Sequence, residues 1–487
     1  MIVPKEVKSV IKKLERNGFK SQIVGGCVRD FLRDVRPRDW DIASSAKPKE
    51  IQKLFPKSFY KNKFFTVTVQ TNNEEKELKE IEITTYRLET KYTDKRHPEQ
   101  IKFAKTIEED LARRDFTVNA MAIELKNKKI NIIDPFNGQE DLKNKTIKAV
   151  GKSEKRFSED ALRMMRAVRF TTTLGKDWKI EKNTAQVIKK NSIWLQAISK
   201  ERIKDELIKI IMSEQAASGI ELLKQLNLLK YIIPELEKGY NISQNKHHIY
   251  ECYEHYVRSL DFAAKKDFSM HVRLASLFHD IGKPEAKRGK GEDATFYNHE
   301  IIGAKMTLEI LNRLKFPKKD IEKIAKLVRY HLFYYTPEEV GESSVRRLVR
   351  QVGPENMKEL LEVRMADRIG SGVPKAEPYK LRHLKYVIEK VSQDPISAKM
   401  LKTTGNDVIK ILKIKPGPRV GQILDILLGY ILENPKKNTR KFLENEIKKL
   451  SKLDEKEVLS LSQRAKKEQG EIEMKKDRMT KKKYWVT

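Results

Sequence analysis

The chain has 487 residues, a length typical of about three domains, and carries 101 Lys and Arg residues against 69 Asp and Glu residues. The resulting net charge of +32 favours a polyanionic partner, most simply nucleic acid, although a genome that enriches Lys, Ile and Asn would also raise it. The two cysteines argue against a disulfide framework and fit a reducing cytosol. The N-terminus shows no apolar signal core and no apolar run is long enough for a bilayer, so we expect a cytoplasmic protein without a membrane partner.

The spacing of apolar residues divides the chain into an α/β part and an all-helical part. Within residues 1–150, short runs typical of strands occur at 65–70, 80–85, 117–125 and 129–134, between stretches with helical spacing. Beyond residue 150, the spacing predicts helices at 158–170, 200–212, 220–229, 248–264, 271–278, 300–314 and 321–331. Residues 451–487 are dense in charge, which predicts a solvated helix with a frayed end or an RNA-contacting arm.

A glycine pair follows the first short apolar run. Gly25 and Gly26 come directly after Ile23 and Val24, which read as a buried strand. Glycine lets the backbone approach a ligand closely and present its N–H groups, and Arg29 adds a fork of donors for phosphate oxygens. The segment therefore predicts a phosphate-binding turn that leads into a helix.

Three carboxylates follow this turn in the order that a nucleotide-transfer site needs. Asp39 and Asp41 are two residues apart, so on a strand their side chains leave the same face. Glu82 lies in an alternating strand pattern and is the expected third carboxylate. Such a set suits Mg²⁺ bound together with substrate phosphates. The alternative is a Gly-Gly turn flanked by surface acids.

The predicted helix at 158–170 carries a polar stripe. Asp160, Arg163, Arg166 and Arg169 are each three apart, so neighbours lie on adjacent faces. Cytosine and adenine both present an amino donor beside a ring-nitrogen acceptor, which a carboxylate and a guanidinium can read. The pair Asp160 and Arg163 thus predicts selection of C and A, with Arg166 and Arg169 left for the triphosphate. A surface helix with i,i+3 ion pairs is the alternative.

Together these motifs resemble class II tRNA nucleotidyltransferases, the CCA-adding enzymes within the polymerase-β-like superfamily. Residues 25–30 and 39–41 look like the family's triphosphate and metal motif, 134–138 resemble its hinge, and 159–163 match its amino-acid template. Residues 110–120 resemble its ribose-recognition motif, which implies ribose contacts from Arg114, Asp115 and Asn119. Residues 87–98 resemble the flexible loop needed to switch from C to A addition, which counts against a CC-only enzyme. Residues 43–48 resemble CCA-adding members more than bacterial poly(A) polymerases.

A second resemblance lies in the helical part, where residues 279–284 look like the signature of an HD domain. The resemblance implies a ligand set for a divalent metal (Mn, Ni, Fe or Mg), with two extra histidines seen in binuclear members. The implied ligands are His255, His279, Asp280 and Asp367, with His299 and His331 as the extra pair. Such domains hydrolyse phosphomonoesters or 2′,3′-cyclic phosphates, which implies trimming of RNA ends, although many have lost activity. His247 and His248 have no assigned role, and Cys27 and Cys252 read as packing residues.

The expected architecture is an α/β nucleotidyltransferase head followed by an all-α neck, body and tail that include a helical HD domain. The expected domains are a head at 1–150, a neck at 151–235, an HD domain at 236–375 and a basic body and tail at 376–487. The expected activity is CCA addition to tRNA from CTP and ATP with Mg²⁺. An A-adding enzyme, a poly(A) polymerase and, in a different class, an HD phosphohydrolase remain alternatives, as does an RNA-binding protein with an inactive transferase site. The oligomeric state stays open.

Overall fold

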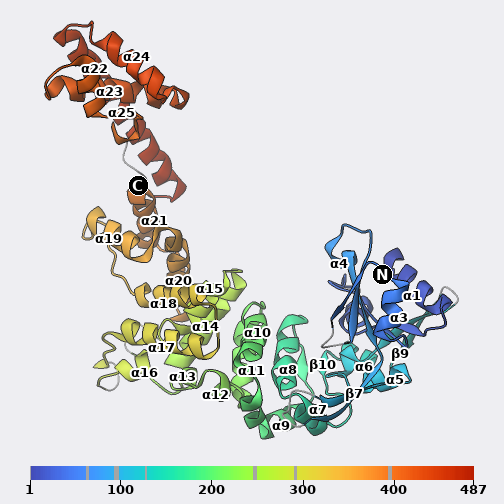
Figure 1. The fold of residues 1–487 in the computed structure, drawn as a ribbon. Helices are drawn as coiled ribbons and strands as arrows, with labels where there is room; N and C mark the ends of the chain where they lie inside the picture. The colour runs from blue at the N-terminus through green and yellow to red at the C-terminus, as the bar shows by residue number, and fades with distance from the viewer. Residues whose placement is uncertain are drawn as a thin grey trace. The chain divides into compact units, whose positions relative to one another are not determined.

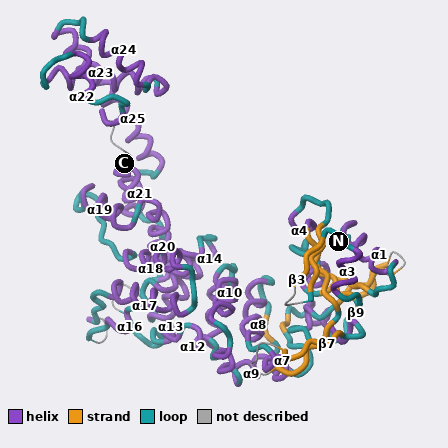
Figure 2. The backbone as a smooth tube through the Cα atoms, viewed as in Figure 1, coloured by secondary structure: helices purple, strands orange, loops and turns teal. Residues whose placement is uncertain are grey.

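The computed structural model describes residues 2–61, 65–92, 98–126, 129–244, 249–289, 293–392 and 398–486. The chain forms two compact units (Figure 1). Unit 1 comprises residues 1–332 and 359–374, and unit 2 comprises residues 333–358 and 375–487. The strands gather in the N-terminal part of unit 1, whereas helices and loops make up the remainder (Figure 2). This distribution confirms the predicted α/β head followed by a helical region.

A mixed seven-stranded sheet forms the head, with the strand order β3-β4-β5-β2-β1-β8-β9. Its strands are β1 (Ser21–Val24), β2 (Asp41–Ser44), β3 (Ser58–Lys61), β4 (Thr66–Gln70), β5 (Glu80–Thr85), β8 (Ala122–Lys126) and β9 (Lys129–Ile133). β2 pairs in parallel with β5, and the other neighbours are antiparallel. The predicted strand at 117–125 is wrong in its first half, because Thr117–Asn119 forms a 3-10 turn before β8.

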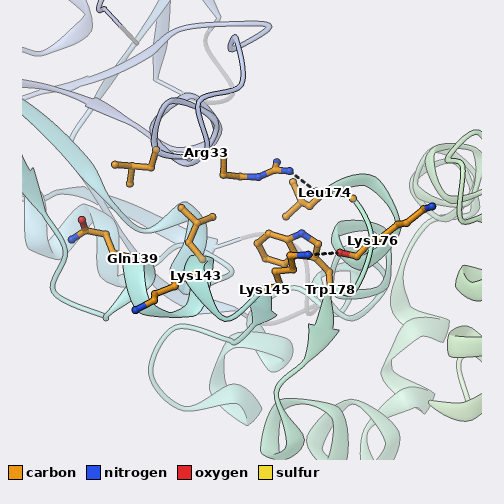
Figure 3. Close-up of a pocket in the computed structure, with 10 residues that line it drawn as sticks. Arg33, Gln139, Lys143, Lys145, Leu174, Lys176 and Trp178 are labelled. Carbon is orange, nitrogen blue, oxygen red and sulfur yellow. Dashed lines mark hydrogen bonds between the residues drawn. The ribbon is translucent and has the colours of Figure 1, made fainter.

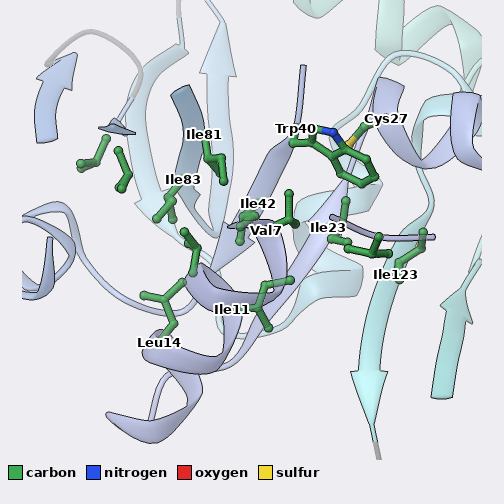
Figure 4. Close-up of a cluster of buried hydrophobic side chains, with 14 of the residues drawn as sticks. Val7, Ile11, Leu14, Ile23, Cys27, Trp40, Ile42, Ile81, Ile83 and Ile123 are labelled. Carbon is green, nitrogen blue, oxygen red and sulfur yellow. The ribbon is translucent and has the colours of Figure 1, made fainter. Parts of the chain in front are cut away.

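One face of this sheet is covered by apolar side chains from two helices. In α1 (Lys5–Arg16), the residues Val7, Ile11 and Leu14 recur at helical spacing and are fully buried. Figure 4 shows them facing a row of strand isoleucines that includes Ile42 and Ile83. α3 (Pro48–Leu54) adds Ile51 to the same cluster. Each such side chain stabilises the head by about 1.5–3 kcal/mol on burial, which fixes the strands that carry the candidate site.

Shorter elements complete the head. The hairpin of β6 (Arg87–Tyr92) and β7 (Pro98–Phe103) holds both ends of the segment that resembles the flexible loop, whose residues 93–97 lie outside the described part. α2 (Gly26–Leu32) follows β1, and α4 (Lys76–Lys79), α5 (Ile107–Ala112) and α6 (Gly138–Lys143) link the strands. β10 (Thr146–Ile147) pairs in parallel with β11 (Lys179–Ile180), which ties the end of the head to the helices that follow.

The remaining helices of unit 1 follow the predicted pattern with one informative exception. The predicted helix at 158–170 is wrong only at its start, because α7 (Ser153–Glu159) ends before Asp160 and α8 (Leu162–Thr173) begins afresh after it. The other helices are α9 (Lys182–Lys190), α10 (Lys200–Ile211), α11 (Ala216–Gln225), α12 (Leu229–Ile232), α13 (Pro234–Glu237), α14 (Cys252–Lys265), α15 (Met270–Phe278), α16 (Lys283–Ala286), α17 (His299–Arg313), α18 (Lys318–Tyr330) and α20 (Met357–Gly370). His247 and His248 lie outside the described residues.

Unit 2 is helical and contains a separate apolar cluster. Its helices are α19 (Glu342–Val352), α21 (Tyr379–Ser392), α22 (Gly405–Leu412), α23 (Pro418–Glu433), α24 (Arg440–Leu450) and α25 (Glu455–Lys483). The prediction that α25 is a solvated helix is wrong in part, because α25 buries Val458 and Ala465. The helix packs closely on α23, where a Cβ at Gly429 would lie 3.2 Å from the Cβ of Ala465. Among the described helices, none is long and apolar enough to cross a membrane.

Candidate active site and metal centre

Two of the three head carboxylates are neighbours where β2 and β5 run side by side. Asp41 and Glu82 are Cα partners in this parallel pair, so their half-buried side chains are neighbours on one face of the sheet. Asp39 is exposed and precedes β2 in a bend, which corrects the expectation that it lies on the strand itself. Partial burial raises the pKa of Asp39, and the nearby charges of Asp30 and Glu82 raise it further. A divalent cation would relieve this repulsion, so the donor set fits Mg²⁺.

Gly25 is required where the chain leaves β1 beside these acids. Its φ is +84°, in the left-handed region that other residues rarely adopt. A Cβ at this position would lie 2.9 Å from Nη1 of Arg114 and 3.5 Å from Oδ2 of Asp41. Gly26 then begins α2. The glycine pair thus brings the backbone close to a carboxylate and a guanidinium that were both predicted to belong to the site.

Both cysteines are buried packing residues, as predicted. The Cys27 thiol donates to the carbonyl of Val24 at 3.1 Å, directly beneath the glycine turn. Burial raises the pKa of Cys27 to about 12, and the charges of Asp41 and Asp39 act in the same direction. Burial also raises the pKa of Cys252 to about 12. Neither thiol is a nucleophile at neutral pH.

A chain of hydrogen bonds joins α2 to α8 through the segment that resembles the ribose motif. Arg29 Nη1 donates to Oδ1 of Asn119 at 2.6 Å, and Asn119 Nδ2 donates to Oδ1 of Asp115 at 3.2 Å. The Nε and Nη2 atoms of Arg166 donate to Oδ2 of Asp115 at 2.8 and 2.5 Å. Burial alone would raise the pKa of Asp115, but the guanidinium of Arg166 outweighs it and holds that pKa well below its usual range. Four residues predicted for nucleotide binding are therefore in one network.

The ring of Phe170 lies at the centre of three arginines. The guanidinium carbons of Arg29, Arg166 and Arg169 lie 5.5, 5.4 and 4.0 Å from its centroid. Arg169 also forms an ion pair with Glu206 of α10 at 2.7 Å. This concentration of positive charge on α2 and α8 suits a polyphosphate. Sequence reasoning missed Phe170, although its place directly after Arg169 is the signal that could have found it.

Arg114 is anchored by an acid that the sequence analysis did not single out. Its Nη2 donates to Oδ2 of Asp110 at 3.1 Å, and Arg113 Nε donates to Oδ1 at 3.0 Å. Burial opposes ionisation of Asp110, but the two guanidinium groups lower its pKa overall. Arg114 is thereby held beside Gly25 and Asp41.

The structure does not bring the predicted base-reading pair together. Asp160 lies in the break between α7 and α8 and accepts from Arg202 Nη2 at 2.7 Å. Arg163 is buried and donates to Oε2 of Glu159 at 2.8 Å and to the carbonyl of Arg113 at 3.1 Å. The two side chains thus have different partners here. The sequence analysis of the polar stripe did not identify these partners, Glu159 and Arg202.

The second cluster lies among the helices of unit 1 and is almost completely buried. All six predicted ligands converge there in two groups that share Asp280. In the first group, His255 Nε2 lies 3.0 Å from Oδ2 of Asp280 and 3.5 Å from Oδ1 of Asp367, and His279 Nε2 lies 3.3 and 3.5 Å from the same oxygens. In the second, His299 Nε2 and His331 Nε2 lie 3.1 and 3.5 Å from Oδ1 of Asp280.

The surroundings of this cluster orient its histidines for a metal. The Nδ1 atoms of His279, His299 and His331 lie 2.7–2.8 Å from the carbonyl oxygen three residues earlier in each case. A carbonyl only accepts, so these Nδ1 atoms carry a hydrogen, and Nε2, on the side of Asp280, is the atom of each ring that would ligate an ion. Lys283 Nζ lies 2.6 Å from Oδ2 of Asp280. Burial would raise the pKa of Asp280, but Lys283 and His279 hold it well below its usual range. The donor set fits divalent metal, which these residues would hold in two groups that have Asp280 in common.

Comparison with known proteins agrees with this arrangement. Residues 21–148 match the "Poly A polymerase head domain", residues 177–239 the "Probable RNA and SrmB- binding site of polymerase A", and residues 252–371 the "HD domain". The chain is 48% identical over 202 residues to a CCA-adding enzyme of Lactobacillus helveticus, a match that covers 41% of this chain and 48% of that relative. It therefore spans about half the length of the CCA-adding relatives that it matches.

Two further similarities extend over most of the chain. An A-adding tRNA nucleotidyltransferase of Deinococcus radiodurans is 31% identical over 419 residues, which cover 83% of this chain and 90% of that relative. A solved structure of the Bacillus stearothermophilus CCA-adding enzyme in complex with CTP matches with a TM-score of 0.60 and 26% identity, over 92% of this chain and 98% of that one. With its head, RNA-binding and HD regions all matched in order, the chain belongs to the tRNA nucleotidyltransferase family.

Proposed function

We propose that this protein builds or repairs the 3′-terminal CCA of tRNA from CTP and ATP, without a nucleic-acid template. The observation that carries the proposal is the pairing of Asp41 with Glu82 on β2 and β5, with Asp39 just before β2 and an arginine network on α2 and α8, in a chain of this family. The relative from Bacillus stearothermophilus, whose solved structure contains CTP, supports the choice of a nucleotide substrate. The net charge of +32 fits an RNA acceptor.

The roles of the head residues follow from their positions. Asp39 and Asp41, with Glu82 as third carboxylate, would hold Mg²⁺. When bound, Mg²⁺ neutralises the phosphoryl charge and favours ionisation of the attacking 3′-hydroxyl. The backbone at Gly25 and Gly26 would face the triphosphate.

The arginine network supplies the remaining charge and the ribose contacts. Arg29, Arg166 and Arg169 would bind the triphosphate, and Arg114, Asp115 and Asn119 would position the ribose. The 3′-oxygen of the RNA then forms a bond to the α-phosphorus while the bond to the pyrophosphate oxygen breaks. Because the arginines are already held by Asp115, Asn119 and Glu206, they need little reorganisation when charge moves to the leaving group.

Base selection by Asp160 and Arg163 is the finer part of the proposal. An ionised Asp160 accepts from an exocyclic amino group, and Arg163 donates to the adjacent ring nitrogen, which suits C and A and leaves G and U mispaired. Reading a base in this way requires Arg202 to release Asp160 and Arg163 to turn from Glu159. Asp160 is partly exposed, so its exchange of Arg202 for a base costs little desolvation.

We assign RNA binding to the neck and to the basic body and tail, in a division of the chain into four domains. We place the head at 1–150, the neck at 151–235, the HD domain at 236–375 and the tRNA-binding body and tail at 376–487. The RNA would be held through backbone phosphates, which give position and shape without sequence. A cytoplasmic location stays a prediction.

Addition of the final A alone is the second candidate within this class. The A-adding relative from Deinococcus radiodurans is matched over 90% of its length, whereas the Lactobacillus helveticus enzyme is matched over 48%. Two observations favour full CCA addition. The identity to the Lactobacillus helveticus enzyme is 48%, against 31% to the A-adding relative, and the segment at 87–98 resembles the loop needed to switch from C to A addition. A poly(A) polymerase would share the same catalytic core.

A separate hydrolytic activity at the HD cluster is the candidate from another class. His255, His279, Asp280 and Asp367 would hold one divalent ion, and Asp280, His299 and His331 a second. Such a site fits hydrolysis of phosphomonoesters or 2′,3′-cyclic phosphates at RNA ends. Lys283, buried beside Asp280, would bind the phosphate.

The decisive experiment is extension of a tRNA transcript that ends at the discriminator base, with CTP and ATP supplied singly and together. Growth by three nucleotides with both substrates, and arrest there, is the expected result. Addition of one A, and only to a transcript ending in CC, would identify an A-adding enzyme. A long ladder of A would identify a poly(A) polymerase, and an absence of extension would overturn the transferase proposal.

A further inference from the structure

A cavity of unit 1 lies apart from the proposed catalytic residues. It has a volume of about 610 Å³ and is lined by the end of α2, by α6, by the end of α8 and by the residues before β11. This volume is within the range of about 300–1,000 Å³ typical of small-molecule sites. None of Asp39, Asp41 and Glu82 is among its lining residues. All of its residues belong to unit 1.

The lining combines positive charge with one aromatic wall. Arg33, Lys143, Lys145 and Lys176 line it together with the indole of Trp178, and no acid is among the described lining residues. The guanidinium carbon of Arg33 lies 5.7 Å from the Trp178 ring centroid, and Nη2 of Arg33 donates to the carbonyl of Leu174 (Figure 3). A cationic cavity that has an indole in its lining can bind a phosphate and stack a base.

The four cations are balanced to different degrees. Arg33 Nη1 lies 3.5 Å from Asp30, and Lys145 Nζ lies 3.2 Å from Asp177, whose side chain is 80% exposed. Lys143 and Lys176 are exposed and form no ion pair with any residue in the described ranges. Their ammonium groups point outward in Figure 3, and flexible lysine side chains can turn toward a bound anion. The cavity therefore has cationic capacity that the protein itself does not neutralise.

We propose that this cavity is a second nucleotide-binding site, in which a base stacks on Trp178 and its phosphate is bound by Arg33 and the surrounding lysines. The ligand is either a free nucleotide or an unpaired nucleotide of a bound RNA, because both present the same ring and phosphate. The site lies at the C-terminal end of α2, whereas Gly25 and Gly26 lie at its start. It goes beyond the proposed CCA addition and does not depend on it.

The test measures binding of AMP by equilibrium dialysis and of a labelled single-stranded pentaadenylate by fluorescence anisotropy, with the full-length protein. The first variant, Lys143→Glu/Lys176→Glu, reverses the two unbalanced charges on the exposed surface. Its matched control, Lys5→Glu/Lys12→Glu, makes the same change of net charge on exposed positions of α1. The second variant, Trp178→Leu, removes the stacking surface, and Trp178→Phe retains it.

We expect the double charge reversal and Trp178→Leu each to lower the affinity for the same probe by about tenfold, the loss typical of removing a stacked base. The control and Trp178→Phe should bind both probes with an affinity close to that of the wild type. A fall in AMP stoichiometry by one site identifies a free nucleotide as ligand, and a loss confined to pentaadenylate identifies RNA. The proposal is overturned if neither probe changes beyond the control. It is also overturned if the charge variant weakens binding and Trp178→Leu does not, since the surface would then attract phosphate without holding a nucleotide.

Discussion

The two acidic centres of unit 1 use the same residue type in opposite surroundings. In the head, Asp39 is exposed, and its pKa is raised by partial burial and by the neighbouring carboxylates. In the HD cluster, Asp280 is 2% exposed and has a lowered pKa, because Lys283 and His279 outweigh its burial. The charges of Asp30 and Glu82 disfavour ionisation of Asp39, which suits a cation that comes and goes with its nucleotide. The HD acids sit in a preformed shell, which suits a resident ion.

The largest effect that tests this difference between the two centres is expected when one head acid is removed. We expect Asp41→Asn to lower nucleotide addition by about 10³-fold or more, because several kcal/mol of transition-state stabilisation depend on the cation that it holds. The matched control is Asp34→Asn, the same substitution at an exposed position seven residues earlier. Extension of the CTP- and ATP-supplied tRNA measures the effect. Equal activity of the two variants would contradict a role of Asp41 in the proposed site. If the two centres are independent, Asp41→Asn should also leave the metal content of the HD cluster unchanged.

The reciprocal change is made in the HD cluster. We expect His279→Gln to weaken metal retention by about 100-fold, because it removes a ligand whose Nδ1 is already fixed on a carbonyl. His271→Gln is the control, since His271 lies on α15 in neither ligand group and its Nε2 is 2.9 Å from Asp320. Elemental analysis after dialysis provides the measurement, and CCA addition should persist in both variants. Retention of metal by His279→Gln at the wild-type level would contradict the assignment.

A smaller effect tests the base-reading pair. We expect Asp160→Ala to lower the preference for CTP and ATP over UTP and GTP by about 30-fold, since one of two polar contacts to the base is lost. Arg202→Ala is the informative partner, because it frees the carboxylate without removing it. Competition between nucleotides in single-addition assays gives the ratio. Unchanged selectivity in Asp160→Ala would exclude the template role, and equal losses in both variants would make Asp160 a structural residue.

The smallest effect concerns stability and pH. The pKa of Asp115 is lowered in the folded protein, so its contribution to stability is complete above the unfolded value near 3.9 and is lost as pH falls toward the folded value. We therefore expect Asp115→Asn to cost about 1–2 kcal/mol at pH 7 and progressively less from pH 5 to pH 3. The exposed Asp205→Asn is the control. Melting temperatures across this range provide the test, and a pH-independent difference would show that ionisation of Asp115 contributes nothing.

Sequence reasoning named the candidate ligands of both centres but not the residues that contact them. Strand alternation placed Glu82 correctly, because period 2 alone determines which face a strand residue occupies. The spacing of Asp160 from Arg163 predicted one continuous helix through both residues. Helical periodicity cannot reveal the break at Asp160, whose side chain is bound by Arg202, 42 residues away. Phe170, Asp110 and Lys283 were missed for the same reason: each acts through contacts that only tertiary packing creates. The six candidate HD ligands came from the resemblance to an HD domain, and the fold brings them together from parts of the chain that are far apart in the sequence.

The two buried thiols make this chain a convenient host for labels. With pKa values of about 12, Cys27 and Cys252 are ionised to only about one part in 10⁵ at pH 7. Maleimide and spin-label reagents, which attack thiolates, would therefore pass over both native cysteines in the folded protein. Two cysteines introduced on exposed helices, one in each unit, would then be the reactive positions. Distances between the two units could then be measured in solution without first removing a native residue.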